Sequence, residues 1–391
     1  MIRRCCLVLA SEASPEGILH DVRILDFTQV MSGPFASMLL SDAGADVVKV
    51  ERPPAGDITR QWGPPFIRGR SLYFGAFNRG KKSLAADFKN PQDLHMVRQL
   101  AEAADVVIEN FRPGTLDRFG LGYQELKPGN PDLVYVSIRG YREDSERTWD
   151  PALEVVLEAE SGLMAITGNS GQPVRQGIAV IDMMTGVLAV AKIMEALYGR
   201  ERGGQGQRVV LSLQETAQLI MTHPYLMHSA AQAPYKAAGT MHPSIAPYEH
   251  FDTADHPIIV GAVNDLEFAR LSEILGHPEW VQGQWSHNTG RVADRSALHS
   301  VLESIFRAEP SHIWVDRLRR AKLVVGEVRS LADAADAWQN DPLSRLSSHD
   351  ERWGHLAYPT SPWRKAGMVA AAPDLGEDGP AVIDRWLYGG K

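Results

Sequence analysis

The sequence predicts an α/β protein: a doubly wound, Rossmann-like large domain joined to a smaller α+β domain. Apolar, β-branched runs of strand length alternate with helical patterns over residues 22–138, which is typical of parallel βαβ units. Shorter strand and helix patterns return over 251–330, after a connector rich in Pro and His. The length of 391 residues favours two domains, because one domain usually takes about 150 residues.

The elements of the large domain follow from local patterns, taken in order along the chain. Buried strands are predicted where apolar residues run together, at 22–27, 46–50, 105–109, 132–138 and 208–213. Helices are predicted at 33–40, 91–104, 151–164, 187–198 and from 214 onward, the first two opened by Pro34 and Pro91. A doubly wound sheet binds its ligand at the carboxyl ends of its strands, which here are 28–29, 51–52, 110–114 and 139–141.

The same patterns give the expected domain boundaries. Residues 1–18 are expected to be a loose leader or a start-site extension, because the apolar stretch 5–10 is shorter than the roughly 7–15 residues of a signal-peptide core. The large domain is expected at 19–222, a linker at 223–250, the small α+β domain at 251–330, and a return to the large domain at 331–391. Within the small domain, the patterns predict a strand at 257–261 and helices at 266–275, 297–308 and 311–321.

Composition narrows the class of function. The net charge of −8 argues against a nucleic-acid-binding protein, which normally carries a basic stripe. No run approaches the roughly 20 apolar residues of a membrane span. The two cysteines, Cys5 and Cys6, are adjacent, so they lack the geometry of a structural disulfide and the spacing of a metal site. We therefore expect a metal-free protein of the reducing cytoplasm.

The common phosphate-binding and nucleophile motifs of α/β enzymes are missing from the sequence. No GxGxxG follows the first strand, and there is neither a P-loop nor a GxSxG elbow. Basic residues gather instead at the predicted strand ends. Each alone is typical of a solvated surface charge, but together they suit a phosphate-bearing ligand. They are Arg52, Lys81, Lys82, Lys89, Arg112, Arg118 and Arg139.

Asp182 is the most informative single residue. Apolar residues flank it on both sides, and an apolar helical run follows. A carboxylate in such surroundings is a candidate functional group, because its desolvation is unfavourable unless it is used for something specific. The alternative is an N-cap, in which Asp182 accepts the amide of Met184 or Thr185 and opens the helix. The residues alone leave both interpretations open.

Several segments resemble the family III CoA-transferases, the group of formyl-CoA transferase, carnitine CoA-transferase and the dicarboxylate CoA-transferases. The resemblance covers about residues 20–350 in order. The segments that carry it are 22–28, 32–34, 44–53, 56–57, 77–87, 104–114, 161–168, 203–207 and 243–248.

The resemblance implies a covalent mechanism on Asp182, which matches the family's catalytic aspartate. The carboxylate attacks the donor acyl-CoA and forms a mixed anhydride, the CoA thiolate converts this to an aspartyl-CoA thioester, and the acceptor acid reverses the sequence. Amides at the start of the helix would stabilise the charge that develops on the thioester oxygen. An intertwined homodimer is also implied. By position, the family's CoA contacts match Gln29, Arg52, Lys89, Asn110, Arg118, Arg139 and Tyr141, of which the arginines suit the CoA phosphates best.

Two departures bear on the acids that are exchanged. Formyl-CoA transferase has a Gln where this chain has Met31, and its glycine-only active-site loop has no counterpart here. We therefore expect dicarboxylic acids, with succinyl-CoA or a similar donor, rather than formate or oxalate, and the 243–248 segment agrees with this expectation. Met31 and Glu154 are candidate substrate contacts, although Glu154 suits structural anchoring equally well.

Two other functions are compatible with the resemblance. An acyl-CoA racemase of the same fold would need a His–Asp pair for two-base proton transfer, but the matching stretch 150–154 contains no His. A CoA-binding protein without catalytic activity would retain the CoA contacts and lose the chemistry, whereas Asp182 and most of the matched contacts are present.

Overall fold

The computed structural model describes residues 17–169, 171–232 and 235–389, and the chain divides into two compact units. The first unit comprises residues up to 161, 177–221 and from 338 onward; the second comprises 162–176 and 222–337. The predicted linker and small domain therefore both belong to the second unit. That unit also takes 162–176 and 331–337, which the sequence pattern assigned to the large domain. The predicted leader falls almost entirely outside the described residues.

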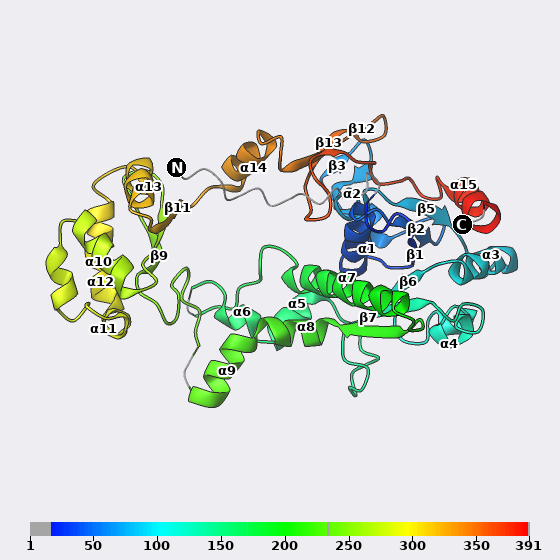
Figure 1. The fold of residues 1–391 in the computed structure, drawn as a ribbon, viewed down its shortest axis with the longest axis horizontal. Helices are drawn as coiled ribbons and strands as arrows, with labels where there is room; N and C mark the ends of the chain where they lie inside the picture. The colour runs from blue at the N-terminus through cyan, green and yellow to red at the C-terminus, as the bar shows by residue number, and fades with distance from the viewer. Residues whose placement is uncertain (1–16, 170, 233–234, 390–391) are drawn as a thin grey trace. The chain divides into compact units, whose positions relative to one another are not determined.

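A six-stranded parallel sheet forms the centre of the first unit, in the order β5-β2-β1-β6-β7-β8 (Figure 1). Its strands are β1 (Arg23–Asp26), β2 (Asp46–Glu51), β5 (Lys82–Ala85), β6 (Val106–Glu109), β7 (Val134–Arg139) and β8 (Arg208–Ser212). Counted along the chain, this is the order 3-2-1-4-5-6 of dinucleotide-binding folds, and the order reverses between β1 and β6. The five predicted strands are confirmed. The edge strand β5 was missed because Lys82 and Ser83 interrupt its apolar pattern.

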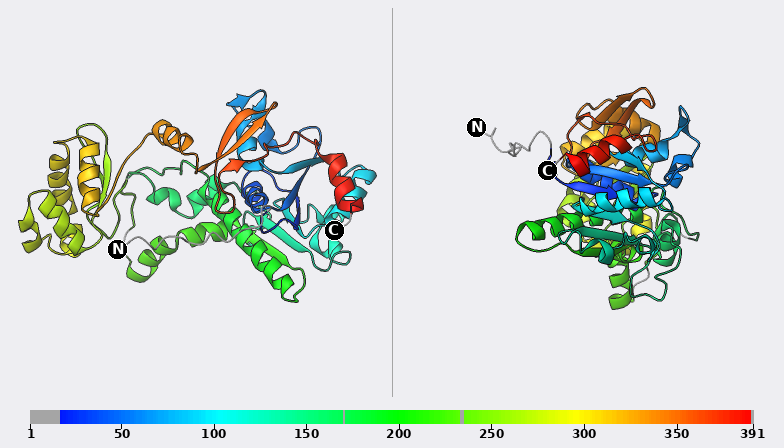
Figure 2. Two further views of the ribbon diagram at one scale, coloured as in Figure 1. Left: turned by 45° about the horizontal axis from the view of Figure 1, so that its top comes forward. Right: turned by 90° about the vertical axis from the view of Figure 1, so that its right-hand side faces the viewer.

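Helices cover both faces of this sheet. On one face, α1 (Ser32–Asp42) and α7 (Val180–Glu201) pack against an apolar cluster that includes Ile24, Val106 and Val136. On the other face lie α3 (Pro91–Glu102), α4 (Tyr123–Leu126), α15 (Gly379–Ile383) and the π-helical turn η4 (Asp384–Tyr388). The C-terminal segment thus returns to the sheet beside α3 (Figure 2). Because helices cover both faces of the sheet, the side chains on both faces of the central strands are buried. This explains why these strands are continuous apolar runs in the sequence.

The first unit also contains shorter elements outside the six-stranded sheet. The sequence pattern predicted one helix over 151–164, but Gly162 (φ 81) separates α5 (Glu154–Glu160) from α6 (Leu163–Ile166). The elements are η1 (Ile58–Gln61), β3 (Phe66–Ile67), β4 (Arg70–Ser71), α2 (Leu72–Asn78), η2 (Asp117–Phe119), α5 (Glu154–Glu160), α8 (Leu213–Ile220), β12 (Arg345–Asp350), β13 (Gly354–Pro359) and β14 (Gly367–Met368).

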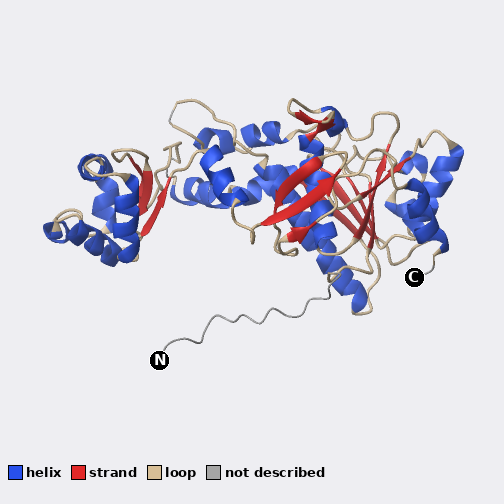
Figure 3. Ribbon diagram, turned by 90° about the horizontal axis from the view of Figure 1, so that it is seen from above, coloured by secondary structure: helices blue, strands red, loops and turns tan. Residues whose placement is uncertain are grey.

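The second unit is an α+β arrangement with its own core. A three-stranded antiparallel sheet, β11-β10-β9, packs on one side against helices (Figure 3). The predicted strand at 257–261 and the three predicted helices are confirmed to within a few residues as β10, α10, α12 and α13. The elements are α6 (Leu163–Ile166), α9 (Thr222–Ala231), β9 (Tyr248–Phe251), β10 (Ile258–Gly261), α10 (Asp265–Ile274), η3 (Pro278–Gln282), α11 (Asn288–Ala293), α12 (Arg295–Phe306), α13 (Ser311–Arg320), β11 (Val324–Glu327) and α14 (Leu331–Gln339). Within the described ranges, no helix is both long and apolar enough to cross a lipid bilayer.

Candidate active site

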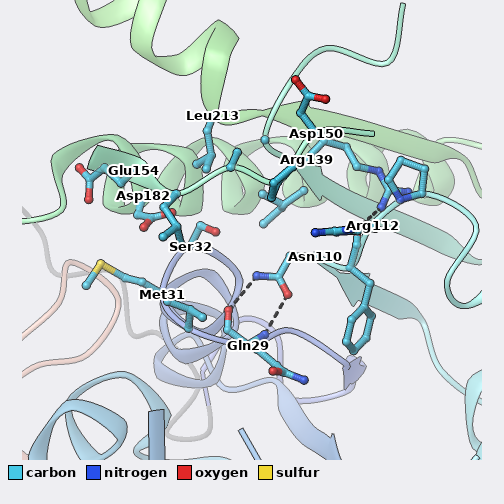
Figure 4. A pocket seen from close by; sticks show the side chains of 18 of the residues that line it. Gln29, Met31, Ser32, Asn110, Arg112, Arg139, Asp150, Glu154, Asp182 and Leu213 are labelled. Atoms are coloured by element: carbon cyan, nitrogen blue, oxygen red, sulfur yellow. Dashed lines mark hydrogen bonds between the residues drawn. The ribbon is translucent and has the colours of Figure 1, made fainter. Parts of the chain in front are cut away.

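A pocket opens in the first unit where the strand order reverses, at the carboxyl ends of β1, β6 and β7 (Figure 4). This is the position at which open parallel sheets bind their ligands. We call it the Asp182 pocket. Its walls come from the segment after β1, the turn after β6, the end of β7, the segment 148–154, α7 and α8. The side chains discussed below are Gln29, Met31, Ser32, Asn110, Arg112, Arg139, Asp150, Glu154 and Asp182.

Asn110 joins the two strands at the reversal point. Its side-chain oxygen accepts the Gln29 amide at 2.9 Å, and its side-chain nitrogen donates to the Gln29 carbonyl at 2.7 Å. The pair therefore resembles a further rung of backbone hydrogen bonding beyond the ends of β1 and β6 (Figure 4). These two hydrogen bonds join the segment after β1 to the segment after β6 on this side of the pocket.

The segment between β1 and α1 is held in a strained conformation by buried charges. Val30 has a φ of 70°, which is unfavourable for a β-branched residue by about 1–3 kcal/mol. Lys49, fully buried on β2, donates to the Thr28 carbonyl at 2.5 Å and pairs with Asp57 at 3.0 Å. Asp57 in turn accepts the Val30 amide at 3.4 Å, and Asp26 accepts the Thr28 amide at 2.8 Å. These contacts fix the segment that carries Met31 and Ser32.

Asp182 lies in the first turn of α7, as the third residue of the helix, so the N-cap interpretation is wrong. The N-cap position is Ala179, which has no side chain capable of capping. Glu154 caps the helix instead: its Oε1 accepts the Ile181 amide at 2.8 Å. Burial raises the pKa of Asp182 to about 6, while a hydrogen bond with Ser32 acts in the opposite direction. The carboxyl group is therefore desolvated, but it is still largely ionised at neutral pH.

The starts of α1 and α7 approach each other closely at Gly186. A Cβ atom at this position would lie 2.7 Å from the Ser32 carbonyl oxygen and 3.1 Å from the Phe35 ring. Only glycine fits there, because real Cβ atoms essentially never come within 3.0 Å of another heavy atom. This close approach brings Ser32 on α1 to Asp182, one helical turn before Gly186 on α7.

A second pocket lies at the carboxyl ends of β1, β2 and β5 in the same unit, and we call it the aromatic pocket. Gln29 and Phe111 line both pockets. The other walls of the aromatic pocket are mainly apolar, and Arg52 and Lys89 add positive charge. The Arg52 side chain is 68% exposed, and its Nε lies 4.0 Å from Asp87, so it is only weakly paired. The apolar wall residues are Phe27, Val50, Phe88, Leu116 and Phe119.

Several of the basic residues singled out in the sequence are neutralised within the fold. Lys81 is buried and pairs with Asp26 at 3.2 Å, and Lys82 pairs with Asp46 at 2.5 Å. Neither lysine lines the Asp182 pocket or the aromatic pocket. The expectation that all seven basic residues form one phosphate site is therefore wrong for these two, because each lysine already has a buried or half-buried carboxylate partner.

Arg139 lies in the Asp182 pocket and has protein partners there. Its Nη2 pairs with Glu109 at 2.9 Å, and its Nη1 donates to the Phe111 carbonyl. Glu109 also accepts the Phe111 amide at 2.9 Å. The pair therefore anchors the turn that follows β6, and Arg139 as a CoA contact stays a prediction.

Tyr141 and Arg118 line neither of the two pockets. Tyr141 is buried, its hydroxyl bonds to Glu160 at 3.2 Å, and the Arg147 guanidinium lies 4.0 Å from its ring centre. Arg118 is exposed and donates to the Gly114 carbonyl at 3.2 Å. Gln29, Asn110, Arg52 and Lys89, by contrast, lie in the two adjoining pockets as their positions at strand ends predicted.

Sequence reasoning missed Ser32 as a functional residue. Ser32 is 4% exposed, lines the Asp182 pocket and lowers the pKa of the Asp182 carboxyl. Its position between Met31 and the Gly33-Pro34 helix start was a usable signal, since residues at such a strand-to-helix junction face the ligand crevice. Met31 and Glu154, the predicted substrate contacts, both line the pocket.

Comparison with known proteins agrees with this geometry. A family model described as CoA-transferase family III matches residues 19–379. The chain is 39% identical over 317 residues to the succinyl-CoA:glutarate CoA-transferase of Mus musculus, a match that covers 81% of this chain and 73% of the relative. It is 33% identical over 378 residues to the acetyl-CoA:oxalate CoA-transferase of Acetobacter aceti, over 95% and 96% of the two chains.

A solved structure supports the same assignment over almost the full length. The crystal structure of a CAIB/BAIF family protein from Brucella suis superposes with a TM-score of 0.83 at 32% identity, covering 95% of this chain and 100% of that one. The mixed α/β fold with its parallel sheet is thus shared. The resemblance seen in the sequence is confirmed, and the chain is an enzyme that belongs to CoA-transferase family III.

Proposed function

We propose that this enzyme moves CoA from succinyl-CoA or a similar acyl-CoA to a dicarboxylic acid through an aspartyl-CoA thioester on Asp182. The half-buried Asp182 carboxylate in the crevice at the strand ends is the observation that carries this proposal. Curated relatives named for succinyl-CoA and glutarate, and for acetyl-CoA and oxalate, support thioester donors and dicarboxylic acceptors. The expectation against oxalate rests on Met31 and on the missing glycine-only loop, whereas one relative is named for oxalate, so oxalate belongs among the acids to be tested.

The chemistry suits a carboxylate in this environment. A partly desolvated carboxylate oxygen attacks the acyl carbon of the donor thioester, the C–S bond breaks, and CoA leaves as thiolate with a mixed anhydride on Asp182. The thiolate then attacks Cγ of Asp182, the bond from Cγ to the bridging oxygen breaks, and the donor acid leaves as carboxylate. The acceptor acid runs the two steps in reverse. Each step exchanges one activated acyl group for another, so no metal or external base is required.

The two pockets divide the CoA thioester between them. We assign the nucleotide end to the aromatic pocket, where aromatic walls suit adenine and Arg52 and Lys89 suit phosphate. The pantetheine arm would then pass Gln29, which lines both pockets, and bring the thioester to Asp182. Of the other predicted contacts, Arg118 is exposed and remains a candidate for an outlying phosphate, whereas Tyr141 already has protein partners.

The homodimer implied by the family remains part of the proposal. Apolar side chains support it: Leu219 on α8 is 57% exposed and Leu226 on α9 is 61% exposed. A second copy of the chain would cover such residues, which are unfavourable in water. Light scattering should give the mass of two chains, and a monomeric mass would exclude the dimer. A cytoplasmic location also stays a prediction, based on the cysteine content.

The test of the proposed function is an exchange assay. The enzyme is incubated with succinyl-CoA and glutarate, oxalate, or a wider panel of acids, and the new acyl-CoA is measured. Asp182→Ala should abolish exchange while CoA binding, measured by calorimetry, is retained. Exchange retained in this variant would remove Asp182 from the mechanism.

The racemase alternative is tested on the same protein. Among the described residues, none of the side chains that line the Asp182 pocket is a histidine, whereas the two-base mechanism needs a second ionisable group. A chiral 2-methylacyl-CoA is incubated in deuterated water, and deuterium at the α-carbon is measured. Deuterium incorporation without any exchange of CoA between acids would establish the racemase and overturn the transferase. CoA binding without either reaction would identify a binding protein.

A further inference from the structure

The Ser32 hydroxyl has no place in the mechanism outlined above, although it is the polar group directly beside Asp182 in the pocket (Figure 4). Ser32 is the first residue of α1 and is buried. Its interaction with the Asp182 side chain lowers the pKa of that carboxyl. An ionised carboxylate has only acceptors, so the hydroxyl donates.

The fold imposes this contact rather than merely allowing it. The strained segment at Val30 is held by the buried Lys49–Asp57 pair and delivers Ser32 to the start of α1. Gly186 then lets the backbone of α7 approach the Ser32 carbonyl. The buried core thus fixes both the backbone that carries Ser32 and the adjacent backbone of α7. Strained backbone of the kind seen at Val30 is typical of functional sites.

We propose that the Ser32 hydroxyl is a catalytic hydrogen-bond donor to the Asp182 oxygen during attack on Cγ of Asp182. The inference rests on the proposed covalent route. When the CoA thiolate attacks Cγ of the mixed anhydride, a C–S bond forms and the carbonyl oxygen of Asp182 becomes an oxyanion. This oxyanion collapses when the bond from Cγ to the bridging oxygen breaks and the donor acid leaves. The attack of the acceptor acid on the aspartyl-CoA thioester passes through an oxyanion on the same atom.

Ser32 therefore acts on some steps and not on others. In the two steps at Cγ, the acyl form of Asp182 is neutral and the oxyanion is charged, so a donor favours the transition state. When Asp182 itself attacks a thioester, its charge is already present and the oxyanion forms on the substrate's oxygen. The hydroxyl gives no comparable help to that step.

The test compares Ser32→Ala with Ser41→Ala, a serine on the same helix whose hydroxyl donates to the Gly80 carbonyl. Each variant is mixed with succinyl-CoA without an acceptor, and the burst of succinate release is followed in a quenched-flow instrument. This burst reports the attack on Cγ. We expect Ser32→Ala to slow it about 100-fold, the typical effect of removing one oxyanion donor, with Ser41→Ala within twofold of wild type. Ser32→Thr, which keeps a hydroxyl, should recover most of the rate.

The pH profile separates this role from a purely structural one. Other ionisable groups in the pocket are Glu154, Asp150, Arg112 and Arg139, but burial and the Ser32 hydrogen bond are the two causes that set the ionisation of Asp182. Without the hydroxyl, the acid limb of kcat/KM should move up by about one pH unit, since a hydrogen bond to a charged group is lost. A packing defect at Ser32 would leave this limb in place.

The outcomes are distinguishable. A wild-type burst with an identical burst and pH profile in Ser32→Ala overturns the role of Ser32 and leaves the proposed function intact. The absence of both burst and exchange in the wild type overturns the proposed function, and the role of Ser32 with it. A slow burst in Ser32→Ala with recovery in Ser32→Thr supports the inference.

Discussion

The close approach of α1 and α7 makes Gly186→Ala an informative substitution. The new Cβ would lie 2.7 Å from the Ser32 carbonyl oxygen, whereas ordinary contact begins at 3.4 Å. The two helices must therefore separate by roughly 0.7 Å, unless the backbone bends locally. Displacements approaching 1 Å at a reacting group lower rates by up to about 100-fold, so we expect kcat to fall 10- to 100-fold.

The effect on stability should be small in comparison. Overpacking destabilises by about 1–3 kcal/mol, and replacing a helical glycine with alanine returns about 0.5–1 kcal/mol. We expect the free energy of unfolding of Gly186→Ala, from urea titration, to fall by about 0–2.5 kcal/mol. A loss of activity much larger than this loss of stability would show that the site, rather than the fold, depends on the contact.

Gly199→Ala is the matched control for this experiment. Gly199 lies on the same helix α7, but a Cβ there would meet nothing within 4 Å. This variant should keep the wild-type kcat and gain about 0.5–1 kcal/mol of stability. Exchange assays on both variants decide the question. Wild-type kcat in Gly186→Ala would refute the reasoning that the approach of α1 to α7 sets the geometry at Asp182.

Three further predictions concern ionisation, capping and CoA binding. Burial raises the pKa of Asp182 from 3.8 to about 6, so ionisation of this carboxyl destabilises the fold as pH rises from about 4 to 6. In urea titrations at pH 8, Asp182→Asn should therefore be more stable than wild type by up to about 3 kcal/mol. Near pH 4 the two proteins should be equally stable. Glu154→Ala removes the acceptor for the Ile181 amide and should lower the free energy of unfolding by about 0.5–2 kcal/mol. Glu154→Gln keeps an acceptor and should keep the exchange activity. An inactive Gln variant would indicate that the charge of Glu154 contacts the substrate. Arg52→Ala and Lys89→Ala should each raise KM for succinyl-CoA about tenfold without lowering kcat. KM for succinyl-pantetheine, which lacks the nucleotide, should stay unchanged. An equal effect on both substrates would contradict the assignment of the nucleotide end to the aromatic pocket.

Strand positions and their carboxyl ends were predictable because they depend on local apolar patterns. The strands that lead into Gln29, Arg52 and Asn110 read directly as buried runs, and parallel packing then brings their ends to one edge. Their gathering around two pockets follows from topology. The sequence pattern could not show that both polar groups of the Asn110 side chain hydrogen-bond the Gln29 backbone, because that contact joins residues 81 positions apart.

Charge pairing was the main property that the sequence left hidden. Lys81 and Arg139 read as free cations at strand ends, but each meets a carboxylate from another strand: Asp26 for Lys81 and Glu109 for Arg139. The capping of α7 was hidden for the same reason, since Glu154 comes from a separate helix. Local patterns identify which residues reach an edge, whereas pairing across strands decides which of them remain available for a ligand.

The central claim is the covalent aspartyl-CoA thioester on Asp182, and mass spectrometry tests it most directly. The enzyme is incubated with succinyl-CoA in the absence of acceptor, quenched in acid and digested. We predict that the mass of the peptide containing Asp182 increases by the mass of CoA minus one water, and that this adduct is missing from Asp182→Ala. Added glutarate, or another active acceptor, should remove the adduct as fast as exchange proceeds. Exchange at the full rate with this peptide unmodified throughout would contradict the account.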